Sequence, residues 1–172
     1  MSKLKDIDYK ILSELLKNSK MSDRKLAKKI GVSQPTVTRR RARLEKDVID
    51  GYTFVPEWEK LGYEILAFTF VKTIRTIGIR EKHEDATKRG TEWLMNHPNI
   101  IMSGGCRGMD TDGFSISVHK SYSDLDSFLS EHKRDLGDIL TNIQTIIVNL
   151  GGNQILKPLH LKYLAEAIQA SR

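Results

Sequence analysis

The sequence has little cysteine and no long apolar run, and both absences narrow the possible functions. Cys106 is the sole cysteine among 172 residues, so no disulfide can form within the chain. No stretch approaches the roughly eighteen apolar residues that a membrane-spanning helix needs. The first ten residues, MSKLKDIDYK, lack the apolar core of a signal peptide. These features predict a protein of the reducing cytoplasm.

Excess positive charge is missing from most of the chain. Residues 61–172 hold 13 basic and 13 acidic side chains, whereas residues 1–60 hold 15 Lys and Arg against 9 Asp and Glu. The whole net charge of +6 therefore lies in the first third of the sequence. A basic module beside a neutral one predicts a polyanionic partner for the basic module alone.

Apolar side chains recur at helical spacing through the first 50 residues and predict three helices. Ser22 is suited to cap the second helix, and Gly31 follows its last apolar residue. Ser33 is suited to cap the third helix, with Pro35 in its first turn, where no amide donor is needed. Two helices joined by a short glycine-containing turn indicate a helix-turn-helix.

The next segment, VIDGYTFVP at residues 48–56, has the pattern of two short strands around a glycine turn, which would form a wing. We therefore expect a winged helix-turn-helix DNA-binding domain at residues 1–52. A connecting strand and linker at 53–62 would lead to a second domain at 63–152, and a C-terminal helix would occupy 153–172.

Residues 63–152 predict the element order strand, helix, strand, strand, helix, strand, which is typical of a ferredoxin-like βαββαβ domain. The expected elements are strands at 65–71, 99–103, 114–119 and 143–150, and helices at 79–94 and 125–136. Both helices would cover one face of the sheet and leave the other apolar face for a second subunit. The fold class is thus α+β, with an extra C-terminal helix that begins at Pro158 and buries Leu161, Leu164, Ala165 and Ile168.

The third predicted helix carries side chains suited to the major groove of DNA. Gln34 can pair with adenine, Thr36 can contact a thymine methyl group, and arginine can pair with guanine. Further arginines and the basic residues of the preceding helix can contact phosphates. The predicted DNA-binding residues are Ser22, Arg24, Lys25, Ser33, Gln34, Pro35, Thr36, Thr38, Arg39, Arg40 and Arg43.

Several segments resemble the leucine-responsive regulator / asparagine regulator (Lrp/AsnC) family of transcription factors. The resemblance covers about residues 4–150 and is most specific in the first 52. The matching motifs are Leu4-Lys5-Asp6-Ile7-Asp8-Tyr9-Lys10-Ile11-Leu12, Asn18-Ser19-Lys20-Met21-Ser22, Leu26-Ala27, Ile30-Gly31-Val32-Ser33, Val37-Thr38-Arg39-Arg40, Arg43-Leu44-Glu45, Val48-Ile49, Gly51-Tyr52 and Leu61-Gly62.

This resemblance implies a homo-oligomer, a dimer or an octamer, that binds palindromic double-stranded DNA and requires no cofactor. It also implies an amino-acid effector near the turn between the second and third strands of the RAM, or ACT-like, domain. We expect that turn at Ser103–Gly113, where Gly108 and Asp112 best match the family's Gly and Asp pair. The predicted effector-binding residues are Gly105, Arg107, Gly108, Asp110 and Asp112.

Four features depart from the family pattern, and one of them is the tail after Leu150, which extends beyond the common family core. Arg41 stands where an aliphatic residue is usual, and Asp47 replaces a glycine that ends the helix. The predicted turn at Ser103–Gly113 is longer and richer in glycine than in the family, so a plain flexible hairpin turn is an alternative to an effector site.

Two other functions fit parts of the sequence. A siroheme decarboxylase would share the two-domain fold, but it would not need the Arg39-Arg40-Arg41 run on its third helix. An RNA-binding module would need exposed aromatic side chains for stacking. The basic region offers few aromatic residues, and we expect them to be core or boundary residues: Tyr9, Tyr52, Phe54 and Trp58. The five histidines show no metal-ligand spacing with each other or with Cys106. We therefore predict a DNA-binding regulator and not an enzyme.

Overall fold

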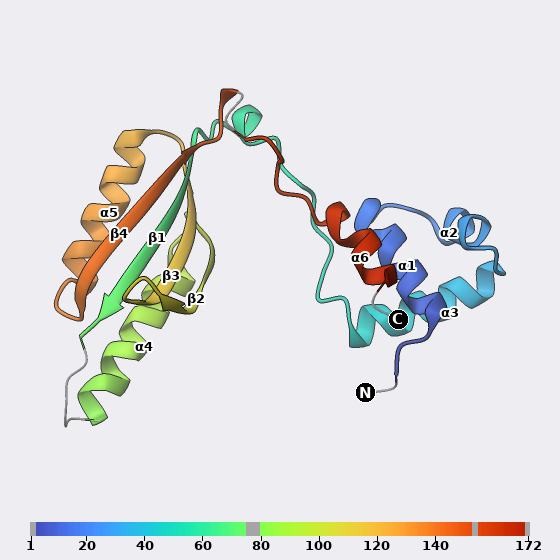
Figure 1. Ribbon diagram of the computed structural model, residues 1–172, viewed down its shortest axis with the longest axis horizontal. Coiled ribbons are helices and arrows are strands. Elements are labelled where there is room, and N and C mark those ends of the chain that lie inside the picture. Colours follow the sequence, from blue (N-terminus) through green and yellow to red (C-terminus); the bar gives the residue numbers. More distant parts are fainter. Residues whose placement is uncertain (1–2, 75–79, 153–154, 171–172) are drawn as a thin grey trace. The chain divides into compact units, whose positions relative to one another are not determined.

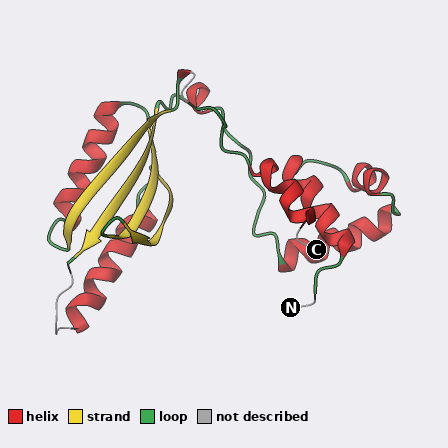
Figure 2. Ribbon diagram, in the orientation of Figure 1, coloured by secondary structure: helices red, strands yellow, loops and turns green. Residues whose placement is uncertain are grey.

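A computed structural model describes residues 3–74, 80–152 and 155–170, except the side chains of residues 80–83. The chain forms two compact units (Figures 1 and 2). Unit 1 combines Met1–Val55 with Lys157–Arg172, and unit 2 is Pro56–Leu156. Because the chain leaves unit 1 and later returns to it, its C-terminal segment folds with its N-terminal residues.

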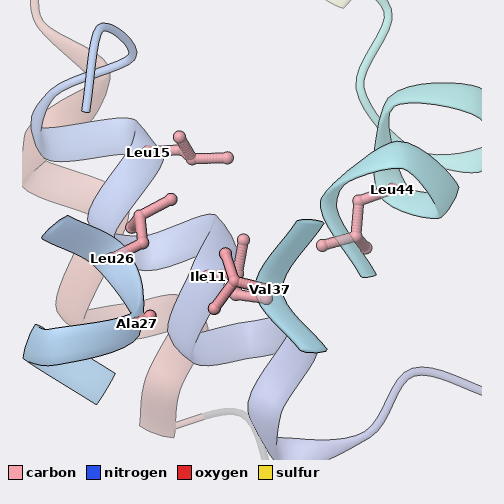
Figure 3. Packing of buried hydrophobic residues seen from close by; sticks show 6 residues of the cluster. All are labelled: Ile11, Leu15, Leu26, Ala27, Val37 and Leu44. Atoms are coloured by element: carbon pink, nitrogen blue, oxygen red, sulfur yellow. The ribbon is translucent and has the colours of Figure 1, made fainter. Parts of the chain in front are cut away.

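Unit 1 is built on three helices that share one apolar core. The helices are α1 (Asp6–Lys17), α2 (Asp23–Ile30) and α3 (Gln34–Asp47). Their inward side chains form a cluster with at most 5% of each side chain exposed (Figure 3): Ile11, Leu15, Leu26, Ala27, Val37 and Leu44. The three predicted helices are confirmed, because apolar residues at helical spacing need a common surface to bury them.

The C-terminal segment packs against α1. It contains the 3₁₀ helix η3 (Leu161–Leu164) and α6 (Ala165–Ala170). Ala165 is completely buried, and the Gln169 Nε2 donates a hydrogen bond of 2.9 Å to the Ser13 Oγ. The predicted helix start at Pro158 was wrong, because helical structure begins at Leu161. The predicted apolar stripe was wrong for Leu161 and Leu164, which are half exposed. Both η3 and α6 contact α1, and Ala165 is the one described residue of this segment that is completely buried.

Placing a charge at Ala165 tests this docking. Ala165→Asp is expected to lower the free energy of unfolding by about 2 kcal/mol, because a carboxylate would enter a site with no room for water. Urea unfolding followed by far-ultraviolet circular dichroism measures the change. Ala170→Asp, at an exposed position of the same helix, is the control, and equal losses in both variants would contradict the packing.

Unit 2 is a four-stranded antiparallel sheet with strand order β2-β3-β1-β4. Its strands are β1 (Ile65–Thr73), β2 (Ile100–Gly108), β3 (Thr111–His119) and β4 (Leu140–Asn149). Its helices are α4 (Arg80–Asn96) and α5 (Tyr122–Leu136), and the 3₁₀ helix η1 (Trp58–Leu61) precedes β1. This order and topology confirm the predicted ferredoxin-like domain. The predicted helix start at Ile79 lies outside the described residues.

Both helices lie on one face of the sheet (Figure 1). Ile65 and Ala67 of β1 pack with Leu125 and Phe128 of α5, and Trp93 of α4 packs against this cluster. Leu66, Phe68 and Phe70 alternate with these residues and therefore belong to the opposite face. Within unit 2 that opposite face has no helix over it among the described residues.

The predicted wing was wrong. Residues 48–56 contain no strand, and Phe54 is 72% exposed. A two-stranded hairpin is marginal without a surface to pack on. Ile49 packs against the core of unit 1, but Val48, Phe54 and Val55 are exposed. Unit 1 is therefore a helix-turn-helix domain without a hairpin wing.

The predicted glycine-rich turn at Ser103–Gly113 was also wrong, because β2 and β3 continue through most of it. Gly105 pairs with Gly113 across the two strands, and only Met109 and Asp110 lie between the strands. Both have positive φ, 51° and 54°, as a two-residue hairpin turn requires. Gly113 permits close packing against β1, because a Cβ at this position would lie 2.9 Å from the Val71 Cγ2.

Candidate nucleic-acid interface

The turn between α2 and α3 is fixed by local hydrogen bonds and one glycine. The Ser22 side chain accepts a hydrogen bond from the Lys25 amide and so caps α2, as predicted. Gly31 ends α2 with φ of 81°, a conformation that costs glycine little. Ser33 precedes α3, but its hydroxyl contacts the Thr36 hydroxyl at 2.8 Å and does not cap the helix. The chain thus enters α3 at a defined angle.

Two apolar side chains fix which face of α3 points into unit 1. Val37 and Leu44 are fully buried in the shared core (Figure 3). They are seven residues apart, which is two helical turns, so they lie on the same side of α3. The residues on the opposite side of the helix must face outward.

A buried carboxylate holds two of the predicted DNA-binding arginines. Asp8 of α1 is fully buried and lies 3.0 Å from the Arg40 Nη1 and 2.7 Å from the Arg43 Nη2. Burial raises the pKa of Asp8. The hydrogen bonds from the Lys5 amide and the Arg40 guanidinium, together with the charges of Arg40 and Arg43, lower this pKa by more, so it lies below its usual value. Arg40 and Arg43 therefore join α3 to α1, a role that the sequence did not predict.

A second carboxylate joins α2 to α3. The Thr38 hydroxyl donates to the Asp23 Oδ2 at 2.7 Å, and the Arg41 Nη1 lies 3.2 Å from the Asp23 Oδ1. The Arg41 Nη1 also donates to the Met21 carbonyl at 2.9 Å, and the Arg41 Nε lies 2.9 Å from the Glu45 Oε1. Arg41, which departs from the family pattern, thus replaces aliphatic packing with ion pairs along the edge of α3.

The other predicted DNA-binding side chains lie on the surface of unit 1. Ser22, Arg24 and Lys25 of α2 and its cap are exposed, and Thr36 is half-buried. At the start of α3 and along its outer side, the exposed residues are Ser33, Gln34, Pro35, Thr38 and Arg39. Among the described residues, Arg24, Lys25 and Arg39 have no ion-pair partner. Their charges are available to a polyanion, which is what phosphate binding needs.

Other basic side chains of unit 1 are neutralised within it. The Lys29 Nζ lies 2.5 Å from the Glu14 Oε2, and the Lys17 Nζ lies 3.3 Å from the Glu14 Oε1. Burial raises the pKa of Glu14, but hydrogen bonds from Lys29 and Lys17 lower it more, so the group stays ionised at neutral pH. Glu14 thus pairs with two lysines of unit 1, whereas no ion pair among the described residues involves Arg24, Lys25 or Arg39.

The five predicted effector residues lie around the hairpin that joins β2 and β3. Gly105 and Arg107 belong to β2, and Gly108 ends that strand with φ of 134°. Asp110 forms an ion pair with Lys72. Asp112 accepts hydrogen bonds from the Thr73 amide at 3.0 Å and the Thr73 hydroxyl at 2.9 Å. Both carboxylates therefore already have partners on β1.

Two buried histidines, His119 and His132, pack within unit 2. His119 is fully buried, and its Nε2 lies 2.8 Å from the Ser117 Oγ. The His132 ring stacks on Trp93 with ring centres 4.7 Å apart. In the parts of the chain that are described, no group of three or more His, Cys, Asp or Glu could hold a metal ion. Over the same residues, no helix is long and apolar enough to cross a membrane.

Comparisons with known proteins bear on both units. The model of the AsnC-type helix-turn-helix domain matches residues 4–45. FL11, an HTH-type transcriptional regulator of Pyrococcus furiosus, is 43% identical over 99 residues, which cover 57% of this chain and 60% of FL11. The leucine-responsive regulatory protein of Rhizobium meliloti is 39% identical over 66 residues, 38% of this chain and 42% of that protein.

The fold of the whole chain also has solved counterparts. The transcriptional regulator NMB0573 of Neisseria meningitidis, solved as a complex with L-Met, superposes with a TM-score of 0.75 at 18% identity. That match covers 85% of this chain and 90% of the regulator. The chain spans between 48% and 60% of the length of the first three curated relatives that it matches. These curated relatives are named as regulators, which leaves the siroheme decarboxylase alternative without support.

Proposed function

We propose that this chain is a transcription regulator of the Lrp/AsnC type that binds specific DNA sequences, because residues 4–45 match the AsnC-type helix-turn-helix domain and the two-domain fold has a counterpart in a solved regulator. One observation carries the proposal: α3 presents Gln34 and Arg39 to solvent while Val37 and Leu44 hold its other side in the core. A helix held in this way can enter the major groove and place its N-terminal side chains against base edges.

Base readout and phosphate binding would be divided between the two helices. Gln34 can pair with adenine through its amide group, and Arg39 can pair with guanine or a phosphate. Arg24 and Lys25, exposed on α2, would contact the backbone that flanks the groove. Arg40 and Arg43 would contribute to DNA binding indirectly, because their ion pairs with Asp8 hold α3 in its orientation on α1.

The proposal includes a dimer that pairs through the open face of the sheet. That face carries Leu66, Phe68 and Phe70 on β1, with Met102 and Ile146 more than half exposed on the outer strands. A two-fold dimer would present two copies of α3 to the two halves of a palindrome. An octamer would require further contacts between such dimers.

The proposal also includes a small effector at the β2–β3 hairpin. An amino acid could direct its carboxylate to the exposed Arg107 or to glycine amides, and its ammonium to Asp110. The complex of NMB0573 with L-Met is consistent with such an effector. Binding would compete with the Lys72–Asp110 ion pair, which would couple the hairpin to β1.

Selection of duplexes from a random pool tests the proposal. We expect the full chain to enrich a palindromic sequence, and Gln34→Ala to change the enriched bases more than it lowers the yield. Repeating the selection with each amino acid present would detect an effector as a change in recovery. Recovery of no common sequence, or preferential recovery of RNA in a parallel pool, would contradict the proposal.

A further inference from the structure

Unit 2 contains a pocket of about 730 Å³ between its sheet and its helices. Its walls include Leu94 of α4, His132 and Leu136 of α5, and Ser103 and Ser115 of β2 and β3. This volume is within the range of pockets that hold small molecules, about 300 to 1,000 Å³. The described residues that line it all belong to unit 2.

The pocket exists because the helix-facing side of the sheet carries small residues at this end. Ser103 pairs with Ser115, and Gly105 pairs with Gly113. The large core side chains, such as Phe128 and Leu125, gather at the other end of the sandwich. On α4, a Cβ added to Gly90 would meet only the Ile139 side chain, at an ordinary contact of 3.8 Å. Small residues on both walls therefore leave the space between them unfilled.

One polar group in the wall lacks a partner. His132 is 2% exposed, and its Nδ1 is buried with no hydrogen bond to any of the described residues. Stacking on Trp93 restricts the orientation of the ring. Burial lowers the pKa of His132 to about 4, so the imidazole is neutral at neutral pH. A buried polar atom without a partner is costly, and such atoms are rare in folded proteins.

The charges in the wall indicate the class of ligand. Asp112 is the one charged residue among the described residues of the lining, and Thr73 already donates two hydrogen bonds to it. Among the described residues that line the pocket there is no lysine or arginine that could bind a phosphate or a carboxylate. The other side chains of the wall are mainly aliphatic.

We propose that this pocket binds an uncharged, mainly apolar small molecule that donates one hydroxyl or N–H hydrogen bond to the His132 Nδ1. The site lies within one subunit and needs neither DNA nor a partner chain. It shares Gly105 and Asp112 with the proposed effector site at the hairpin, but Arg107, Gly108 and Asp110, which would hold the charged groups of an amino acid, do not line it. Failure of DNA binding would therefore leave this inference unaffected.

Phenol and benzene are matched probes, because they differ in one hydroxyl group. In titrations of the full chain followed by methyl NMR, we expect phenol to bind at least fivefold more tightly than benzene. The ¹⁵N resonance of the His132 Nδ1 should shift with phenol alone. In His132→Phe, the two probes should bind with equal affinity. Equal affinity for the wild-type protein, or no binding of either probe, would overturn the proposal.

Filling the pocket gives an independent test. Gly90→Leu introduces a side chain from α4 and Ser103→Leu one from β2, and each should weaken phenol binding at least tenfold. Leucine is a better helix former than glycine, so Gly90→Leu should preserve α4. Lys88→Leu, exposed on the same helix, is the control and should bind phenol like the wild type. Wild-type binding in both filled variants, with the thermal midpoint retained, would contradict the assignment.

Discussion

Replacing Arg39 with alanine is expected to weaken binding to the selected duplex by roughly tenfold to a hundredfold. Arg39 is exposed on α3 and has no ion-pair partner among the described residues, so its charge is available to DNA. The same exposure means that the variant should unfold at the same temperature as the wild type. Fluorescence anisotropy with a labelled duplex and differential scanning calorimetry measure the two quantities.

A charge-matched control separates contact from net charge. Lys133→Ala removes one positive charge from an exposed position on α5, in unit 2. It should leave DNA affinity within about twofold of the wild type, since the lost charge lies outside the basic unit. If Arg39→Ala and Lys133→Ala lose affinity equally, or if neither loses any, Arg39 does not contact DNA.

Replacing Asp8 with asparagine is expected to lower the free energy of unfolding by about 3 kcal/mol at neutral pH. Asparagine keeps the size of the side chain and can still accept the Lys5 amide hydrogen bond, but it removes both ion pairs, to Arg40 and Arg43. Urea unfolding followed by circular dichroism gives the stability. Hydrogen exchange should show faster opening of α3 in the variant.

The effect of this substitution should depend on pH in one direction. The pKa of Asp8 is lowered in the folded protein, so its stabilisation is complete above the ordinary value of 3.8. It disappears as the pH falls from that value through the lowered pKa. The wild type and Asp8→Asn should therefore converge in stability in strong acid. A difference that is constant from neutral pH to acid would show that the ion pairs do not account for the loss.

The helix-turn-helix could be predicted because its signals are local. Ser22, Gly31 and Pro35 mark the ends of helices, and Val37 and Leu44 fall on one face of α3. The roles of the consecutive arginines could not be predicted in the same way. Successive residues point about 100° apart on a helix, and which arginine turns inward depends on carboxylates that are distant in sequence. Arg40 meets Asp8 across 32 residues, and Arg41 meets Asp23 across 18.

The ferredoxin-like topology also followed from pattern, because strands with alternating burial and helices with apolar stripes have few ways to pack. The turn at Ser103–Gly113 was predicted wrongly because glycine occurs both in turns and at closely packed positions inside strands. Gly104 and Gly105 indicated a long turn in the sequence, yet they lie inside β2, beside Phe114 and Gly113 of β3. The pocket could not be predicted at all, since it depends on small residues from β2, β3 and α4 that meet only in the folded unit.

The salt dependence of DNA binding by the full chain tests the central claim most directly. If the exposed cations of α2 and α3 lie against a duplex, affinity for the selected sequence should fall roughly a hundredfold or more between about 50 and 200 mM salt. A protein that ignores duplex DNA at the lower salt concentration, or binds it equally well at both, would contradict the account.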